Sequence, residues 1–286
     1  MKSQHLKHLF ELNIAILFIS TSGALGRFIE MPIPVIIWWR SALAVVILFI
    51  FFRYRRINLN IKSKKDIVPV LLTALLTGAH WMLYFHALKL SNVAIGMLSL
   101  FTYPVIIALL EPLFVKVKFD AVRILLAFIV IVGVFILVPE FNLENTHVKG
   151  ILFGLLSAVC YALRILISKQ LVRSYSGYHL IFYQILVLTI ILAPVLFTMD
   201  NSGITTQFPY ILILALVTTA IGHSMFIHSL KHFTATTVSI LSSAQPIFGI
   251  IIAYFFLREI PSINTLFGGL LIISTVVIES VRSKKK

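Results

Sequence analysis

The chain has 286 residues, of which 59% are hydrophobic and only 12% are charged, and its mean hydropathy is +1.02. A soluble domain carries about 25% charged residues, so this composition excludes a soluble fold and leaves no stretch for a separate soluble domain. The net charge of +14 would suggest nucleic acid in a soluble protein. Here the basic residues lie in short segments between apolar runs, so they indicate orientation in a membrane and no nucleic-acid partner.

Motifs that carry enzyme or metal chemistry are missing from the sequence. Cys160 is the only cysteine, which excludes an intrachain disulfide and a zinc site built from cysteines. There is no HExxH, GxSxG or P-loop motif and no cluster of acids for a metal ion. We therefore expect a protein that is not an enzyme, with no catalytic residues, no metal and no cofactor.

Apolar runs of about 20 residues, each long enough to cross a bilayer, recur along the whole chain. They predict an all-α integral membrane protein with ten transmembrane helices. The basic N-terminal flank is followed by many further spans, which favours a first transmembrane helix over a cleaved signal. The predicted helices are 10–29, 33–52, 67–88, 92–114, 119–138, 148–168, 177–198, 208–230, 234–256 and 263–281.

The distribution of Lys and Arg predicts how the helices are oriented. If the N-terminus is cytoplasmic, the cytoplasmic segments hold 17 basic residues and the outer segments hold 4. Cytoplasmic loops carry the excess of Lys and Arg in membrane proteins. We therefore expect a multi-pass protein of the cell (cytoplasmic) membrane with both termini in the cytoplasm.

The two halves of the chain repeat each other weakly. The tetrad HALK at 86–89 matches HSLK at 228–231, and Pro104 matches Pro246 at the same spacing, which we call the repeat offset. The repeats would be 1–143 and 144–286, with five helices each. An odd number of helices turns the second copy upside down, and inverted repeats are a common plan among alternating-access transporters.

Several motifs resemble the drug/metabolite transporter superfamily, and within it the ten-helix EamA-type permeases. The motifs are Trp39-Arg40-Ser41-Ala42, the repeated proline with its clearest copy at 242–246 (SSAQP), and Leu257-Arg258-Glu259 before the last helix. The first half departs from the pattern, because Val117 stands where the glutamate would be and Glu111-Pro112 lies earlier.

The resemblance covers nearly the whole chain and implies a carrier that switches between inward-facing and outward-facing states. Such carriers are often exporters of amino acids or related metabolites. We therefore expect a secondary transporter for a small polar metabolite, with export as the favoured direction. An importer or exchanger of a nucleoside-like or nucleotide-derived metabolite is the alternative, and a polytopic enzyme acting on lipid is a more distant one.

Pro104 and Pro246 are expected to break the fourth and ninth helices near mid-membrane. Proline removes a backbone hydrogen bond and clashes with the preceding turn. The freed carbonyls need partners, and broken helices at matching places in two halves point to a transport site. Tyr103 and Gln245 precede the two prolines and should lie close to that site.

Two arginines lie within predicted spans, where a charge costs roughly 2.5–3.5 kcal/mol on insertion scales. Arg40 is about 10 Å deep and is either an anchor for a carboxylate, a snorkelling side chain or part of a structural ion pair. Arg164 shares one helix face with Ser157, Tyr161 and Ser168. We expect Tyr161 to line a cavity and Arg164 to snorkel to the cytoplasmic surface.

Titratable groups within the spans are candidates for coupling transport to protons. His80 lies four residues before Tyr84 on the third helix, His223 lies near the middle of the eighth, and Glu111 lies near the cytoplasmic end of the fourth. Histidine titrates near physiological pH, and burial can shift an acid toward it. The alternatives are a helix–helix hydrogen bond for each histidine and an interfacial acid for Glu111.

The expected partners are a small-molecule substrate, membrane lipid and protons as the coupling ion, and a homodimer is left open. The sequence predicts a central cavity lined by Trp39, Arg40, His80, Tyr84, Tyr103, Tyr161 and Gln245.

Overall fold

The computed structural model describes residues 2–114, 122–137, 142 and 144–283, and the elements in them are all helical. Eight segments are long and apolar enough to cross a membrane, and two shorter apolar helices, Ile124–Leu137 and Ile263–Ile278, are the fifth and the tenth in chain order. The prediction of an all-α protein with ten membrane helices is confirmed.

Several of the ten segments consist of more than one helix. Single helices form α1 (Lys2–Phe28), α2 (Ile33–Tyr54), α3 (Ile67–Leu90), α6 (Val122–Leu137), α7 (Thr146–Leu171) and α14 (Ile263–Ser283). The composite segments are α4 (Val93–Leu100) with α5 (Tyr103–Phe114), α8 (Gly177–Leu192) with α9 (Val195–Thr198), α10 (Ile204–Ile213) with the π-helix η2 (Leu214–His223) and α11 (Ser224–Ser229), and α12 (Ala235–Leu241) with α13 (Ala244–Leu257). A short 3-10 turn, η1 (Lys64–Asp66), precedes α3.

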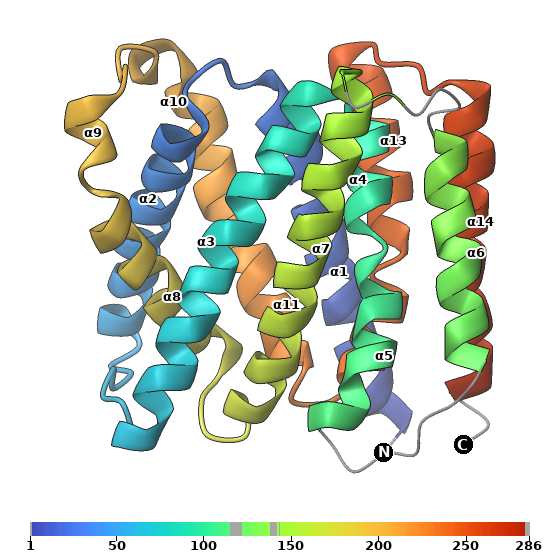
Figure 1. Cartoon of the computed structure of the whole chain (residues 1–286). Helices are drawn as coiled ribbons and strands as arrows, with labels where there is room; N and C mark the ends of the chain where they lie inside the picture. Colours follow the sequence, from blue (N-terminus) through green and yellow to red (C-terminus); the bar gives the residue numbers. More distant parts are fainter. Residues whose placement is uncertain (1, 115–121, 138–141, 143, 284–286) are drawn as a thin grey trace.

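The segments run up and down through the bundle, as Figure 1 shows. The helix α1 begins and α14 ends at the same end, which we call the terminal end, and we call the other the distal end. The helices α6 and α14 lie side by side at one edge of the bundle (Figure 1) and share an apolar cluster with α4 and α7.

Both predicted helix breaks are present. The break between α4 and α5 falls at Phe101 and Thr102, and Pro104 is the second residue of α5. The break between α12 and α13 falls at Ser242 and Ser243, just before Pro246. Proline has no backbone N–H to donate. The N–H groups in the first turn of a helix have no partner within that helix, so proline is tolerated there and each new helix starts just before its proline.

Two features of the helices differ from the sequence prediction. The first helix starts at Lys2 and not at position 10, because the polar N-terminal flank continues the helix beyond the apolar run. The eighth segment contains a π-helical stretch, in which the Thr219 hydroxyl donates to the Leu214 carbonyl five residues earlier (2.8 Å). Such stretches are often found at functional sites, and hydrophobic periodicity does not reveal them.

Small residues allow the helices around the centre to approach closely. At Gly249 of α13, an added Cβ would collide with the Met97 sulfur of α4. Small residues serve this purpose at helix contacts within membranes. The broken segments are thus held against the centre of the bundle.

Candidate functional site

A small polar cavity lies in the interior where α1, α2, α3, α4, α7, η2 and α13 meet. Its volume is about 20 Å³, which is close to the space that one water molecule needs. The conformation is therefore closed around its polar centre. The lining residues are Ile19, Ser22, Arg40, His80, Trp81, Tyr84, Met97, Leu100, Tyr161, His223 and Gln245.

Arg40 of α2 points into this cavity and is only 1% exposed. Its Nε donates to the Thr219 hydroxyl (2.6 Å), and its guanidinium carbon lies 3.8 Å from the centre of the Trp81 ring. Its Nη2 is buried without a hydrogen-bond partner among the described residues. A planar guanidinium stacked on an aromatic ring is pre-oriented, so Arg40 can present its remaining N–H groups to an incoming acceptor.

The π-helical turn places the hydroxyl that Arg40 binds. Thr219 occupies η2, and its own hydrogen bond to the Leu214 carbonyl fixes the oxygen in the direction of α2. The repeat offset pairs Thr219 with Thr77 of the first half, which donates to the Gln184 amide oxygen (3.2 Å). Each of the two threonines thus contacts the second helix of the opposite half.

A stack of rings forms another wall of the cavity. The His80 and Tyr161 rings are stacked with centres 4.3 Å apart, and Tyr103 meets Tyr161 edge-on at 4.7 Å. The His80 Nδ1 shares a hydrogen bond with the Ser157 hydroxyl (2.7 Å), which also donates to the His80 backbone carbonyl. Ser157 and Tyr161 of the polar stripe predicted on α7 therefore face α3, and Tyr84 lies beyond His80 on the same face of α3.

Arg164 is fully buried, so the expectation that it snorkels to the surface is wrong. Its Nε and Nη2 both donate to the Gln184 amide oxygen (3.2 and 2.9 Å), and its guanidinium carbon lies 5.8 Å from the Tyr161 ring centre. Side chains lean toward the N-terminus of their helix, and α7 begins at the distal end. Arg164 is therefore directed toward the middle of the bundle, and not toward the nearer terminal end.

Neither buried arginine has an acidic partner in the part of the chain that the structure describes. The ion pairs there involve Glu11 and Glu259, near the two ends of the bundle. Arg40 and Arg164 contact only neutral acceptors, and the Arg164 Nη1 is also buried without a partner. Since a buried charge without a counter-charge is costly, the arrangement favours an anion that enters the site.

His223 of η2 and Trp81 of α3 contact each other across the cavity, with ring centres 5.5 Å apart. The repeat offset separates these two positions as well, which is the contact expected near a pseudo-twofold axis. Gln245 of α13, beside the helix break, also lines the cavity and leaves its Nε2 unpaired among the described residues.

Two residues predicted to line the cavity, Trp39 and Tyr103, do not line it, and neither does the coupling candidate Glu111. Trp39 is adjacent to Arg40 on α2 and so points to another face, where its indole N–H donates to the Asn201 side chain (2.7 Å). Glu111 lies near the terminal end of α5 and accepts a hydrogen bond from the Thr236 hydroxyl of α12. Tyr103 supports Tyr161 from behind the cavity wall.

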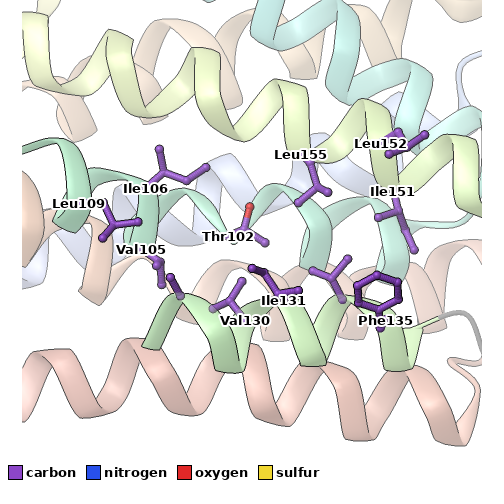
Figure 2. Close-up of a pocket in the computed structure, with 12 residues that line it drawn as sticks. Thr102, Val105, Ile106, Leu109, Val130, Ile131, Phe135, Ile151, Leu152 and Leu155 are labelled. Atoms are coloured by element: carbon purple, nitrogen blue, oxygen red, sulfur yellow. The ribbon is translucent and has the colours of Figure 1, made fainter. Parts of the chain in front are cut away.

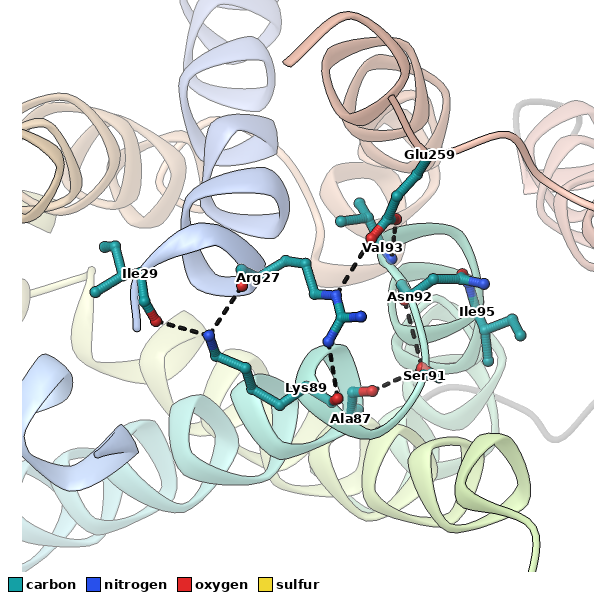
Figure 3. Close-up of polar contacts among 9 residues, drawn as sticks. All are labelled: Arg27, Ile29, Ala87, Lys89, Ser91, Asn92, Val93, Ile95 and Glu259. Atoms are coloured by element: carbon teal, nitrogen blue, oxygen red, sulfur yellow. Dashed lines mark hydrogen bonds and ion pairs between the residues drawn. The ribbon is translucent and has the colours of Figure 1, made fainter. Parts of the chain in front are cut away.

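The distal end is closed by a polar network (Figure 3). The Arg27 Nε donates to the Glu259 carboxylate (3.2 Å), whose second oxygen accepts from the Val93 backbone N–H (2.8 Å). Arg27 also donates to the Lys89 carbonyl, and the Lys89 ammonium binds the carbonyls of Arg27 and Ile29. This network joins α1, the α3–α4 turn and the segment between α13 and α14.

The terminal end has a related but simpler tie. Lys169 of α7 donates to the carbonyls of Leu230 and Phe233 in the α11–α12 turn (2.6 and 2.7 Å). The repeat offset pairs Lys169 with Arg27, so a basic residue binds the corresponding turn in each half. The residue that would answer Glu259 is Val117, which lies outside the described residues.

A larger pocket, of about 380 Å³, lies between α5, α6 and α7 (Figure 2). Its lining is aliphatic or aromatic apart from Thr102, whose hydroxyl is already bonded to the Ser99 carbonyl. Ile131 and Phe135 on its rim are more than half exposed. A polar metabolite finds no hydrogen-bond partners in this lining, and such a surface within the membrane fits lipid chains.

Thr219, Ser22 and Met97 are site residues that the sequence did not single out. Thr219 could have been found from the repeat, because the repeat offset pairs it with Thr77. The same offset pairs Ser22 with Arg164, whereas Met97 carries no such signal. Among the described residues, no three or more His, Cys, Asp or Glu side chains are grouped so that they could hold a metal ion.

Proteins similar to this chain are membrane transporters. The EamA-like transporter family matches residues 9–138 and again 148–280. The pseudopaline exporter CntI of Pseudomonas aeruginosa (strain UCBPP-PA14) is 26% identical over 257 residues, which are 89% of this chain and 88% of the relative. The S-adenosylmethionine uptake transporter of Rickettsia felis (strain ATCC VR-1525 / URRWXCal2) is 28% identical over 115 residues, 40% of this chain and 39% of the relative. A solved crystal structure has a TM-score of 0.74 over 98% of both chains at 15% identity, which shows the fold alone.

Proposed function

The chain belongs to the EamA-like transporter family, and from this premise we propose that it is a secondary carrier that exports a small polar metabolite by alternating access. The protein is a multi-pass membrane transporter. The proposal adds the direction, the mechanism and the substrate class, namely an amino acid or a related compound that carries a carboxylate.

The proposal of a substrate that carries a carboxylate rests on the surroundings of Arg40. Arg40 is buried beside the central cavity, is held by Thr219 and Trp81, and keeps Nη2 without a partner among the described residues. A carboxylate would satisfy this guanidinium, and the rings of Trp81, Tyr84 and Tyr161 would cover the apolar part of the substrate. The cavity of about 20 Å³ is too small for a metabolite, so the carrier must open to bind one.

Export is the favoured direction because the pseudopaline exporter CntI, which matches 89% of this chain, is named an exporter. Import of a nucleoside-like or nucleotide-derived compound is the second candidate. It is favoured by the S-adenosylmethionine uptake transporter, which matches a shorter stretch, and by the stacked rings beside the cavity.

We further propose that both termini face the cytoplasm of the cell membrane and that protons drive transport. The terminal end would then be cytoplasmic, in line with the 17 basic residues assigned to that side. His80 and His223 line the cavity and are the coupling candidates within it, whereas Glu111 would act at the terminal end. The two repeats, 1–143 and 144–286, would rock against each other around the cavity.

The direct test is transport by the purified full chain in proteoliposomes, with and without an imposed pH gradient, across labelled amino acids and nucleosides. Movement of a carboxylate-bearing compound that responds to the pH gradient is expected, and His80→Gln or His223→Gln should remove that response. Transport of nucleosides alone would favour the second candidate, and no transport of any compound would contradict the carrier. Labelling of Asn60→Cys in a Cys160→Ala background should occur only from the cytoplasmic side.

A further inference from the structure

The unpaired nitrogens around the central site are hydrogen-bond donors. Four buried nitrogens that can only donate have no partner among the described residues: Arg40 Nη2, Arg164 Nη1, Trp81 Nε1 and Gln245 Nε2. Three of these four side chains line the cavity, and the fourth lies beside Tyr161, which also lines it. The site therefore offers many donors and calls for a ligand rich in acceptors.

The same site offers an ammonium group only neutral acceptors, such as the Tyr84 hydroxyl and the His223 Nδ1, which are also buried without a partner among the described residues. Among the described residues, no Asp or Glu lines the cavity, and the face of Trp81 that could bind a cation is already covered by Arg40 at 3.8 Å. A zwitterionic substrate would bring its own positive charge into a region that already holds two buried guanidinium groups. Like charges at close range are unfavourable where water is excluded.

The two arginines lie at different depths in the bundle, Arg40 in the lining of the cavity and Arg164 beside the lining residue Tyr161. Arg40 lies seven residues after the distal start of α2, and Arg164 lies seven residues before the terminal end of α7. At a rise of about 1.5 Å per residue, each is about 10 Å from its own end of the bundle. Tyr161 links them, since it lines the cavity with Arg40 and lies beside the Arg164 guanidinium.

We infer that the substrate is a small organic dianion whose two carboxylates pair with Arg40 and Arg164. The inference rests on the proposed function and narrows its substrate class. A substrate with one carboxylate would leave one buried guanidinium without a counter-charge, whereas two carboxylates match both. Arg164 becomes a binding residue that sets the preference for a second anionic group, with Gln184 positioning it.

The test compares ligands that differ by one charge and little in shape. Apparent affinities are measured from the thermal stabilisation of the full-length purified protein by succinate, glutarate and adipate, and by glutaramate, the monoamide of glutarate. At least one dicarboxylate should bind about tenfold or more tightly than glutaramate, in line with a charge-assisted hydrogen bond. L-Leucine should bind more weakly than the best dicarboxylate.

The variant Arg164→Gln supplies the decisive comparison. It should lower the affinity for dicarboxylates to that for glutaramate and change the affinity for glutaramate much less, because a neutral amide loses a weaker hydrogen bond than a carboxylate does. The exposed Arg173→Gln on the same side of the protein is the matched control and should keep the preference. The melting temperature of Arg164→Gln without ligand should not fall, because the change removes a buried charge that has no counter-charge.

Several outcomes would overturn the inference. They are equal binding of glutarate and glutaramate, an unchanged preference in Arg164→Gln, or a large fall in the melting temperature of that variant. Tighter binding of glycerol 3-phosphate than of every dicarboxylate would show that the dianion is a phosphate and reject the carboxylates. If leucine or a nucleoside is transported while no dicarboxylate binds, the inference fails and the carrier function stands.

Discussion

Two pockets of this protein contrast sharply in size and chemistry. The pocket between α5, α6 and α7 has a volume of about 380 Å³ and an apolar lining, whereas the central cavity has about 20 Å³ and collects His80, His223, Arg40 and Gln245. Volume alone would favour the apolar pocket over the central cavity. The unpaired donors select the second, because polar atoms buried without partners require an explanation and apolar walls in a membrane do not.

The small central cavity and the ties at both ends relate this closed conformation to the proposed transport cycle. A carrier that is open to one side of the membrane must first close its site to both sides before it opens to the opposite side. Its substrate cavity is therefore smallest in the closed state. The ties at both ends, Arg27 with Glu259 and Lys169 with Leu230, are present together. The apolar pocket has exposed rim residues, and none of its lining residues belongs to either tie.

The largest effect is expected from Arg40→Ala, which should weaken substrate binding by about ten- to hundredfold, the range of a charge-assisted hydrogen bond. Arg40→Lys should rescue binding only in part, since lysine lacks the planar fork. The measurement is the substrate concentration that gives half-maximal transport in proteoliposomes, together with the amount of protein in the membrane.

The matched change in the apolar pocket is Ile131→Ala, which should leave transport affinity unchanged. Ile131 is 53% exposed, and its side chain contributes only to the apolar rim. A large loss in Ile131→Ala combined with normal affinity in Arg40→Ala would reverse the assignment of the two spaces. Loss of the protein from the membrane in Arg40→Ala would mark that residue as structural.

A smaller effect is expected at the ends. Arg27→Gln removes the distal ion pair, and Lys169→Gln removes the corresponding tie at the terminal end. A partly exposed ion pair and hydrogen bonds to backbone carbonyls each contribute little, so each variant should speed the opening of its own end by about two- to fivefold. The measurement is the rate at which a cysteine at position 22 reacts from each side, and equal changes on both sides in one variant would contradict the assignment.

The sequence predicts the fold of this protein more completely than it predicts the site. Hydrophobic run length predicted the ten segments because the bilayer fixes the length of a span, and Pro104 and Pro246 predicted the breaks for a local steric reason. The π-helical turn and the contact of Arg164 with Gln184 depend on packing between helices, which run length does not record. Trp39 shows the same limit, since its neighbour Arg40 points into the cavity and it does not.

Alternating access requires that the polar cavity open in turn to the two sides of the membrane. Ser22 lines this cavity and is 5% exposed, so Ser22→Cys in a Cys160→Ala background places one small thiol at the site. The measurement is its reaction with a membrane-impermeant thiol reagent in right-side-out and in inverted vesicles. We predict labelling in both preparations, slowed by the dicarboxylate that binds most tightly. Labelling from one side only, or from neither, would contradict alternate opening of this cavity to the two sides of the membrane.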